Sequence, residues 1–137
     1  MRFLAWHLES FRATPTEKGR SKIVEEASTV EAENSLLVFA NFERSDEANQ
    51  GETVSKATNE IVSVCRNLKI GTVILDPFAH LFAEPSTPES AVSMLKSLEA
   101  SLRGNNLQVK RLAFGMFYEL EIKAKGHRYS RIARRIE

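Results

Sequence analysis

Apolar residues along the chain fall into two kinds of pattern, short continuous runs and stripes with helical spacing. The runs MRFLAWHL (1–8) and SLLVFANFE (35–43) predict strands, and the second is apolar enough for a central strand covered on both faces. Residues 9–34 between them are polar and interrupted by proline and glycine. We therefore expect an irregular segment there, with a hairpin arm around Ile23 and Val24.

Two stripes with helical spacing predict two helices. The first runs from about Glu52 to Leu68, where apolar residues recur at intervals of three and four. The second follows Thr87, which can cap a helix N-terminus, and Pro88, which fits the first helical position, and it stops at Gly104. The apolar stripe of this second helix consists of Ala91, Leu95, Leu98 and Leu102.

Further strands are predicted by TVILD (72–76), by residues 107–112 and by residues 116–125, whose apolar side chains alternate. The order of elements predicts a single α/β domain with a mixed sheet and two helices packed on it, followed by a basic tail. Pro77 ends the strand TVILD. The residues of the loop 77–86 are thus delivered to the carboxyl edge of the sheet, where α/β folds often carry their functional sites.

His80 lies at that edge. Taken by itself, it can be a catalytic group, a ligand, or a ring that caps the backbone of its own loop, and the last is the simplest explanation. Cys65 lies beside the apolar stripe of the first helix and is expected to be a packed thiol. Three histidines and one cysteine without ligand spacing predict no zinc site, and isolated glycines predict no phosphate-binding loop, so we expect no metal and no cofactor.

The length and composition suit an ordinary globular domain. The chain has 137 residues, of which 42% are hydrophobic and 27% charged. No apolar run approaches the roughly 20 residues that span a bilayer, so no membrane association is expected. A single cysteine excludes an intrachain disulfide, and the reducing cytoplasm is the expected location.

The net charge of +1 conceals an asymmetry along the chain. Residues 1–102 carry 10 Lys and Arg against 15 Asp and Glu, whereas residues 103–137 carry 9 against 3. The basic end can contact a polyanion such as a nucleic-acid backbone. It can equally be a solvated face without a partner, for example a helix that leads into a linker.

Four segments, in this order and at this spacing, resemble one known family. They are MRFLAWH at the start, VFANFERSDE (38–47), PFAHL (77–81) and FGMFYELEIKAKGH (114–127). Over nearly its whole length the chain is similar to the N-terminal editing domain of archaeal-type threonyl-tRNA synthetases, which shares its fold with D-aminoacyl-tRNA deacylases. The resemblance implies that residues 1–137 form an editing domain, the N-terminal part of a longer chain.

The activity that the resemblance implies is hydrolysis of mischarged L-seryl-tRNA(Thr), sparing L-threonyl-tRNA(Thr). Threonine exceeds serine by one methyl group, which is worth only about 1–3 kcal/mol of discrimination in a pocket. A synthetic site that admits threonine therefore cannot exclude serine well enough. A second site, too small for threonine, can remove the error.

The resemblance also implies a set of site residues. The pocket histidine of the family falls on His80, and Tyr118 occupies the position next to the segment that holds the terminal adenosine. The wall and substrate-holding positions of the family fall on Phe42, Glu43, Pro77, Phe78, Ala79, Ala91, Phe114, Gly115, Met116 and Phe117. The basic residues expected to contact tRNA are Lys125, Arg128, Arg131, Arg134 and Arg135.

The sequence departs from the family at two positions. Tyr118 stands where a functional lysine is common, and Arg131 aligns with a glutamate that the family uses. A neutral tyrosine cannot supply positive charge to a developing oxyanion. Either this copy is inactive, or catalysis does not depend on that side chain. We favour the second interpretation, because the ribose 2′-hydroxyl beside the ester can position or activate water while backbone amides stabilise the oxyanion.

The expected partners are the 3′ end of tRNA(Thr) carrying serine, a second copy in a homodimer, and a catalytic synthetase on the same chain or on a separate subunit. Two other functions remain open. One is a D-aminoacyl-tRNA deacylase, which removes D-amino acids. The other is a non-catalytic module that binds tRNA or dimerises and leaves the ester intact.

Overall fold

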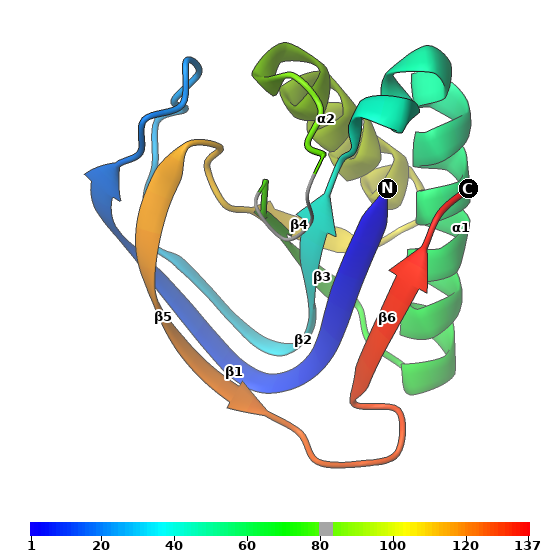
Figure 1. The fold of residues 1–137 in the computed structure, drawn as a ribbon. Helices are drawn as coiled ribbons and strands as arrows, with labels where there is room; N and C mark the ends of the chain where they lie inside the picture. Colours follow the sequence, from blue (N-terminus) through cyan, green and yellow to red (C-terminus); the bar gives the residue numbers. More distant parts are fainter. Residues whose placement is uncertain (80–83) are drawn as a thin grey trace.

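A computed structural model describes residues 1–79 and 84–137 of the chain. Within these residues the chain forms six strands, two α-helices and one short 3-10 helix (Figure 1). Their bounds are β1 Arg2–Lys18, β2 Val30–Asn41, η1 Arg44–Asn49, α1 Gln50–Leu68, β3 Thr72–Pro77, α2 Pro88–Gly104, β4 Gln108–Arg111, β5 Met116–Ala124 and β6 Arg131–Arg135. Both helices and the strands predicted at 35–43, 72–76, 107–112 and 116–125 are confirmed within a few residues.

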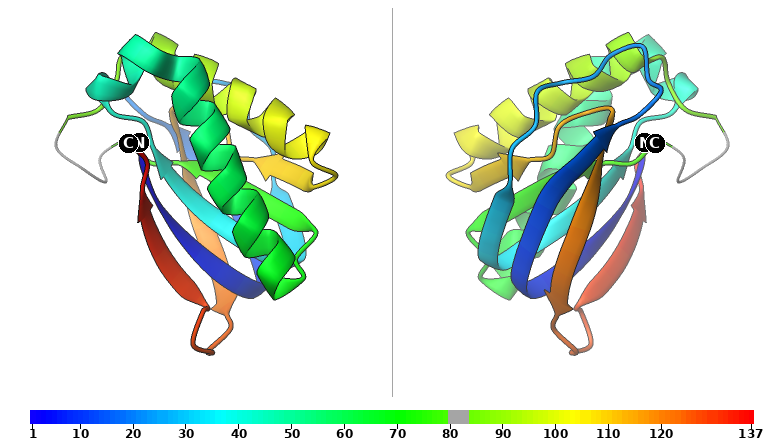
Figure 2. Two further views of the ribbon diagram at one scale, coloured as in Figure 1. Left: turned by 90° about the vertical axis from the view of Figure 1, so that its right-hand side faces the viewer. Right: turned by 90° about the vertical axis from the view of Figure 1, so that its left-hand side faces the viewer.

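The described strands form one mixed sheet in the order β4-β3-β2-β1-β5, and β6 also pairs with β1. The strands β2, β3 and β4 run parallel, because α1 and α2 supply the crossovers between them. β1 is antiparallel to β2, β5 and β6. The two helices lie on one side of the sheet, as Figure 2 shows. The expected α/β domain with a mixed sheet and two packed helices is therefore confirmed.

The long strand β1 bends the sheet into a curl (Figure 1). Its first part, Arg2–Trp6, pairs with β6, and its second part, Leu8–Lys18, pairs with β5. The pairing with β5 shifts register at two places, between Leu8 and Ser10 and between Pro15 and Glu17. Such irregularities bend a strand and increase its twist. The sheet consequently has an outer face under the helices and an inner, concave face.

Each face of the sheet has its own apolar cluster. The outer core holds Leu36, Val38, Val73 and Leu75 from β2 and β3 together with the helix stripes that include Ile61 and Leu98. The inner cluster holds the alternate strand residues, Leu37, Phe39 and Ile74 among them, against Leu8, Phe11, Ala13 and Leu112. The period of two along a strand explains this division. Cys65 is 2% exposed in the outer core, and burial raises the pKa of its thiol to about 12, as expected of a packed thiol.

One sequence-based expectation, and one alternative that the sequence left open, were wrong. The segment 9–34 is not irregular throughout: β1 continues to Lys18, and β2 begins at Val30, so only residues 19–29 form the hairpin connection. The basic tail is not a solvated helix, because Arg131–Arg135 form β6. Both errors concern strand pairing, which joins residues distant in sequence and leaves a weak local signal in polar segments.

The hairpin connection 19–29 is fastened to the segment that precedes β5. The Glu25 carboxylate accepts hydrogen bonds from Arg111 Nη2 at 3.0 Å and from the Phe114 N–H at 2.9 Å, while the Glu25 N–H donates to the Phe114 carbonyl at 2.9 Å. These contacts hold the pKa of Glu25 below its usual value, and the hydrogen bond from Arg111 contributes most to this lowering. Gly115 has a φ of 82° and lies directly against the backbone of Ile23.

We expect Gly115→Ala to lower the free energy of unfolding by about 1–3 kcal/mol. A methyl group there would lie 2.5 Å from the Ile23 carbonyl oxygen, in a left-handed backbone conformation that alanine rarely adopts. Gly71→Ala is the matched control, since nothing lies within 4 Å of an added methyl group at that position. Urea denaturation of both variants measures the difference. Equal stability of the Gly115→Ala and Gly71→Ala variants would show that the 19–29 connection does not pack closely against Gly115.

Candidate functional site

The predicted site residues of β2, β3 and α2 come from elements that meet at one end of the sheet. Pro77 is the last residue of β3 and pairs with Ala40 of the parallel strand β2. Phe78 follows, and its N–H donates to the Ala40 carbonyl at 2.8 Å. The helix α2 begins close by, because Thr87 caps it and the Ser86 N–H donates to the Phe42 carbonyl at 3.0 Å. This arrangement is the one that a strand stopped by proline predicts.

Three of the predicted wall residues are buried in the outer core. Phe42 is 5% exposed, Ala91 9% and Phe114 7%. Their side chains therefore lie in the core on the helix side of the sheet, not in the inner-face cluster. Phe78 and Phe117 are the exposed members of the predicted set, at 41% and 58%. Phe117 alternates with the inner-face residues of β5 and so faces outward, whereas Met116 lies on the same side as Tyr118.

Glu43 takes part in a buried ion pair network at the N-terminus of the described chain. Its carboxylate lies 3.2 Å from Arg2 Nε and 3.5 Å from the Met1 amino group, which also donates to Asp46 Oδ1 at 2.6 Å. Glu43 and Asp46 form a capping box at the start of η1. A cavity of about 460 Å³ adjoins these groups and reaches Thr53 and Arg135. It lies on the side of η1, α1 and β6, away from the inner face.

Tyr118 joins the two ends of the curl. It packs on the inner face from β5, and its hydroxyl accepts a hydrogen bond of 2.7 Å from the Ala113 N–H, just beyond β4. Burial raises the pKa of Tyr118, and the negative charges of Asp76 and Glu25 add to the rise. The phenol is therefore neutral near pH 7. Because its oxygen already accepts from Ala113, its own proton is left for another acceptor.

Asp76 is an inner-face residue that the sequence-based set did not include. It alternates with Ile74 of the inner cluster, pairs in register with Phe39, and lies near enough to Tyr118 to raise the pKa of that phenol. No hydrogen bond or ion pair joins its carboxyl group to any residue in 1–79 or 84–137. Burial raises the pKa of Asp76 to about 7. The one charged residue in the apolar strand TVILDP was the signal that could have identified it.

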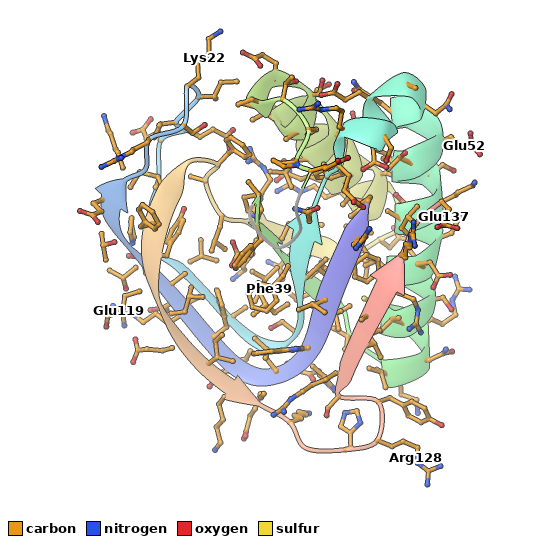
Figure 3. The ribbon with its side chains drawn as sticks, viewed as in Figure 1. Lys22, Phe39, Glu52, Glu119, Arg128 and Glu137 are labelled. Carbon is orange, nitrogen blue, oxygen red and sulfur yellow. The ribbon has the colours of Figure 1, made fainter. Side chains whose placement is uncertain are left out.

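Asn41, also outside the predicted set, fixes the backbone at the end of β3. Its Nδ2 donates to the Phe78 carbonyl at 2.9 Å and to the Ala79 carbonyl at 3.1 Å. The ring of Phe78 meets Phe39 edge to face, with the ring centroids 6.2 Å apart. Figure 3 shows Phe39 among the side chains inside the curl. The backbone of Phe78–Ala79 is therefore fixed by hydrogen bonds to the end of β2 and to the buried amide of Asn41.

The other predicted residues lie elsewhere or cannot be placed. His80 lies outside the described residues. Lys125 and Arg128 lie at the opposite end of β5 from Met116, roughly 20 Å from Tyr118 at the rise of an extended strand; Figure 3 shows Arg128 at that turn.

The predicted basic residues of β6 have contacts within the chain. Arg131 lies over the Trp6 ring at 5.6 Å, Arg134 Nε is 3.4 Å from Glu60, and Arg135 Nε is 2.7 Å from Glu137. These three arginines are spread along β6, and Lys125 and Arg128 precede that strand. The five predicted basic residues therefore do not form one compact group.

The described residues contain neither a cluster of metal-binding side chains nor a membrane-spanning helix. Among them, no group of three or more His, Cys, Asp or Glu side chains is arranged to hold a metal ion. No helix in 1–79 or 84–137 is both long and apolar enough to cross a membrane. The inner face offers a held backbone, a phenol whose proton is available, and the Asp76 carboxyl group, which has no partner within 1–79 and 84–137.

A curled mixed sheet with two helices on one side is the fold class expected from the resemblance, and a solved structure shares it. The c-Myc DNA Unwinding Element Binding Protein superimposes with a TM-score of 0.68 over 100% of this chain and 99% of that chain, at 13% sequence identity. At this identity the likeness shows the fold alone. The expected single-domain α/β fold, a mixed sheet with two packed helices, is thereby confirmed.

The chain belongs to the family described as the Archaea-specific editing domain of threonyl-tRNA synthetase, whose sequence model matches residues 1–136. The threonine–tRNA ligase of Methanosarcina acetivorans is 37% identical over 128 residues, 93% of this chain and 20% of the relative. Those of Thermococcus onnurineus and Methanocaldococcus jannaschii are 37% and 36% identical over 87% of this chain. The chain spans about a fifth of the length of these curated relatives. The family predicted from the four segments, and with it the editing class, is confirmed.

We expect Asp76→Asn to raise the free energy of unfolding at pH 8 by on the order of 1–2 kcal/mol, a value reduced for the partial exposure of the carboxyl group. The folded-state pKa of Asp76, about 7, lies above the ordinary value of 3.8 for an aspartate, so the folded protein favours the neutral acid. The stability of the wild type therefore falls as pH rises from about 4 to 7, and the gain in the variant should vanish below pH 4.

Urea denaturation at pH 4 and pH 8 measures this effect. Glu119→Gln, at an exposed position on the outside of β5, is the control and should change stability little at either pH (Figure 3). An Asp76→Asn variant less stable than the wild type at pH 8 would contradict an unpaired carboxylate at that position.

Proposed function

We propose that this domain hydrolyses the ester of L-seryl-tRNA(Thr) and spares L-threonyl-tRNA(Thr). The family supports editing, and the held backbone at the end of β3 supports the selectivity. Three hydrogen bonds fix Phe78–Ala79: one to the Ala40 carbonyl and two from Asn41. A wall of fixed backbone and one alanine methyl group can exclude a further methyl group, which a flexible side chain would accommodate.

Ester cleavage in this proposal depends on the RNA. Water adds to the ester carbonyl carbon, the bond from that carbon to the ribose oxygen breaks, and the proton goes to the ribose oxygen, so that serine and tRNA are released. The neighbouring ribose 2′-hydroxyl positions the water. The Tyr118 phenol, whose oxygen is occupied by the Ala113 N–H, can donate its proton to a substrate oxygen and orient the ester.

His80 is the last residue of the proposed site, and we do not assign it the role of general base. His80 comes three residues after Pro77 and belongs, by the resemblance, to the pocket. We assign it an orienting contact with the substrate. Its loss should then cost about tenfold in rate, the equivalent of about 1.4 kcal/mol.

The basic residues Lys125, Arg128, Arg131, Arg134 and Arg135 are proposed to contact tRNA phosphates away from the ester. Arg128 has the most open position, in the turn between β5 and β6, whereas Arg134 and Arg135 have carboxylates of the chain beside them. Phosphate contacts make affinity fall steeply with added salt. A tRNA affinity that is indifferent to salt between 50 and 200 mM (roughly the range over which such contacts weaken) would exclude this role.

The proposed assembly includes a homodimer and a catalytic threonyl-tRNA synthetase, in the same chain or as a separate subunit. β4 and β5 end the strand order within the described residues, and an open strand edge can pair with a second copy. Light scattering at high micromolar concentration tests the homodimer, which a monomeric mass would exclude.

We expect the domain to deacylate L-seryl-tRNA(Thr) at least about fivefold faster than L-threonyl-tRNA(Thr), because one excluded methyl group is worth about 1–3 kcal/mol. Release of radiolabelled amino acid from each charged tRNA measures both rates. D-Aminoacyl-tRNA is the third substrate: faster hydrolysis of D-esters would favour the chiral deacylase instead. Binding of charged tRNA with both esters left intact would favour the non-catalytic module.

A further inference from the structure

Two oxygen acceptors on the inner face have no donor within the described part of the chain. One is the carboxyl group of Asp76 on β3. The other is Asn41 Oδ1 on β2, which is buried and unpaired, while the amide nitrogen of the same side chain is committed to two carbonyls. β2 and β3 are parallel neighbours, and Asp76 pairs with Phe39, so Asn41 lies two residues further along on the same face.

Within the described residues, no positive charge is recorded as acting on Asp76. Phe39 packs edge to face against Trp6 on one side and Phe78 on the other, with centroid distances of 5.3 and 6.2 Å. Arg111, whose charge acts on the neighbouring Tyr118, is itself bonded to Glu25 and Glu99. A half-buried carboxylate without a cation destabilises the folded chain. A ligand that brings a cation would remove that cost.

We propose that the Asp76 carboxylate binds the α-ammonium group of the aminoacyl ester, so that the domain selects substrates with a free amino group. The identity of the ligand rests on the proposed function. In an aminoacyl ester the ammonium nitrogen and the carbonyl carbon are attached to the same carbon atom. Holding the ammonium at Asp76 on β3 therefore also directs the carbonyl group, and Tyr118 on β5 is the inner-face donor near Asp76 that can meet its oxygen.

The affinity for an ammonium ligand should depend on pH through Asp76. Its pKa near 7 means that the empty site is partly protonated at neutral pH, and only the carboxylate attracts the cation. Tyr118, on the same inner face, interacts electrostatically with Asp76, and the Glu25–Arg111 pair acts on Tyr118; the Glu25 carboxylate is neutralised by Arg111 and is not offered to the ligand. Affinity should therefore fall by up to about tenfold per pH unit below pH 7.

The test uses two stable amides of 3′-amino-3′-deoxyadenosine. One carries L-serine, and the other carries L-glyceric acid, in which a hydroxyl group of similar size replaces the ammonium. We expect wild-type protein at pH 7.5 to bind the serine amide at least tenfold more tightly in calorimetric titration. Asp76→Asn should bind both amides alike, and Glu119→Gln, on the outside of β5, should keep the wild-type preference.

Several outcomes would overturn the inference. They are equal binding of the two amides by the wild type, no binding of either, or an Asp76→Asn variant that weakens both by the same factor. None of these outcomes decides the proposed function, which the hydrolysis assay on seryl-tRNA(Thr) tests separately. Conversely, an ammonium preference at Asp76 in a protein that leaves seryl-tRNA(Thr) intact would support the site and contradict the deacylase.

Discussion

The bend of β1 is the constraint on which the rest of the structure depends. One strand of 17 residues pairs with β2 along most of its length, while its other edge pairs first with β6 and then with β5. The register shifts opposite β5 allow the second part to curl over the first. Without this curl, β5 and the end of β4 would lie at opposite edges of a flat sheet, and the Tyr118 hydroxyl could not reach the Ala113 N–H.

The inner face formed by the curl combines a rigid backbone with polar groups that are not fully satisfied. Asn41 holds the Phe78 and Ala79 carbonyls but leaves its own oxygen without a donor in the described residues, and Asp76 lacks a cation there. Unsatisfied polar groups reduce stability, and proteins retain them mostly where a ligand completes the hydrogen bonding. In the proposed function, the fixed backbone excludes threonine, and the open acceptors bind the seryl ester.

The sequence predicted the elements whose signals are local. The helix stripes of α1 and α2, the Thr87 cap and the apolar strand β2 depend on neighbours a few residues apart, and all are present. The second part of β1 was missed, although Phe11 and Ala13 alternate with polar residues there, because the polar side chains dominate its composition. β6 was missed because its sequence, RIARR, has one partly buried apolar residue, and pairing with β1 decides its structure.

The site, too, could be predicted from the sequence only where its signal is local. The sequence pattern located the strand end at Pro77, and the resemblance marked the position of Tyr118 but implied no role for Asp76 or Asn41. Asn41 becomes a candidate only when the fold brings β2, β3 and β5 to one face, whereas the single charge in TVILDP could already have marked Asp76. The predicted roles of His80 and of the basic residues remain predictions.

The central claim is that the protein supplies shape and orientation while the RNA supplies the catalytic hydroxyl. Single-turnover hydrolysis of seryl-tRNA(Thr) ending in 2′-deoxyadenosine tests it most directly, beside Tyr118→Phe and His80→Ala proteins acting on the ordinary substrate. The account predicts no measurable hydrolysis of the deoxy substrate and a loss of about tenfold for each variant. Normal hydrolysis of the deoxy substrate, or a His80→Ala protein as inactive as the wild type on that substrate, would contradict it.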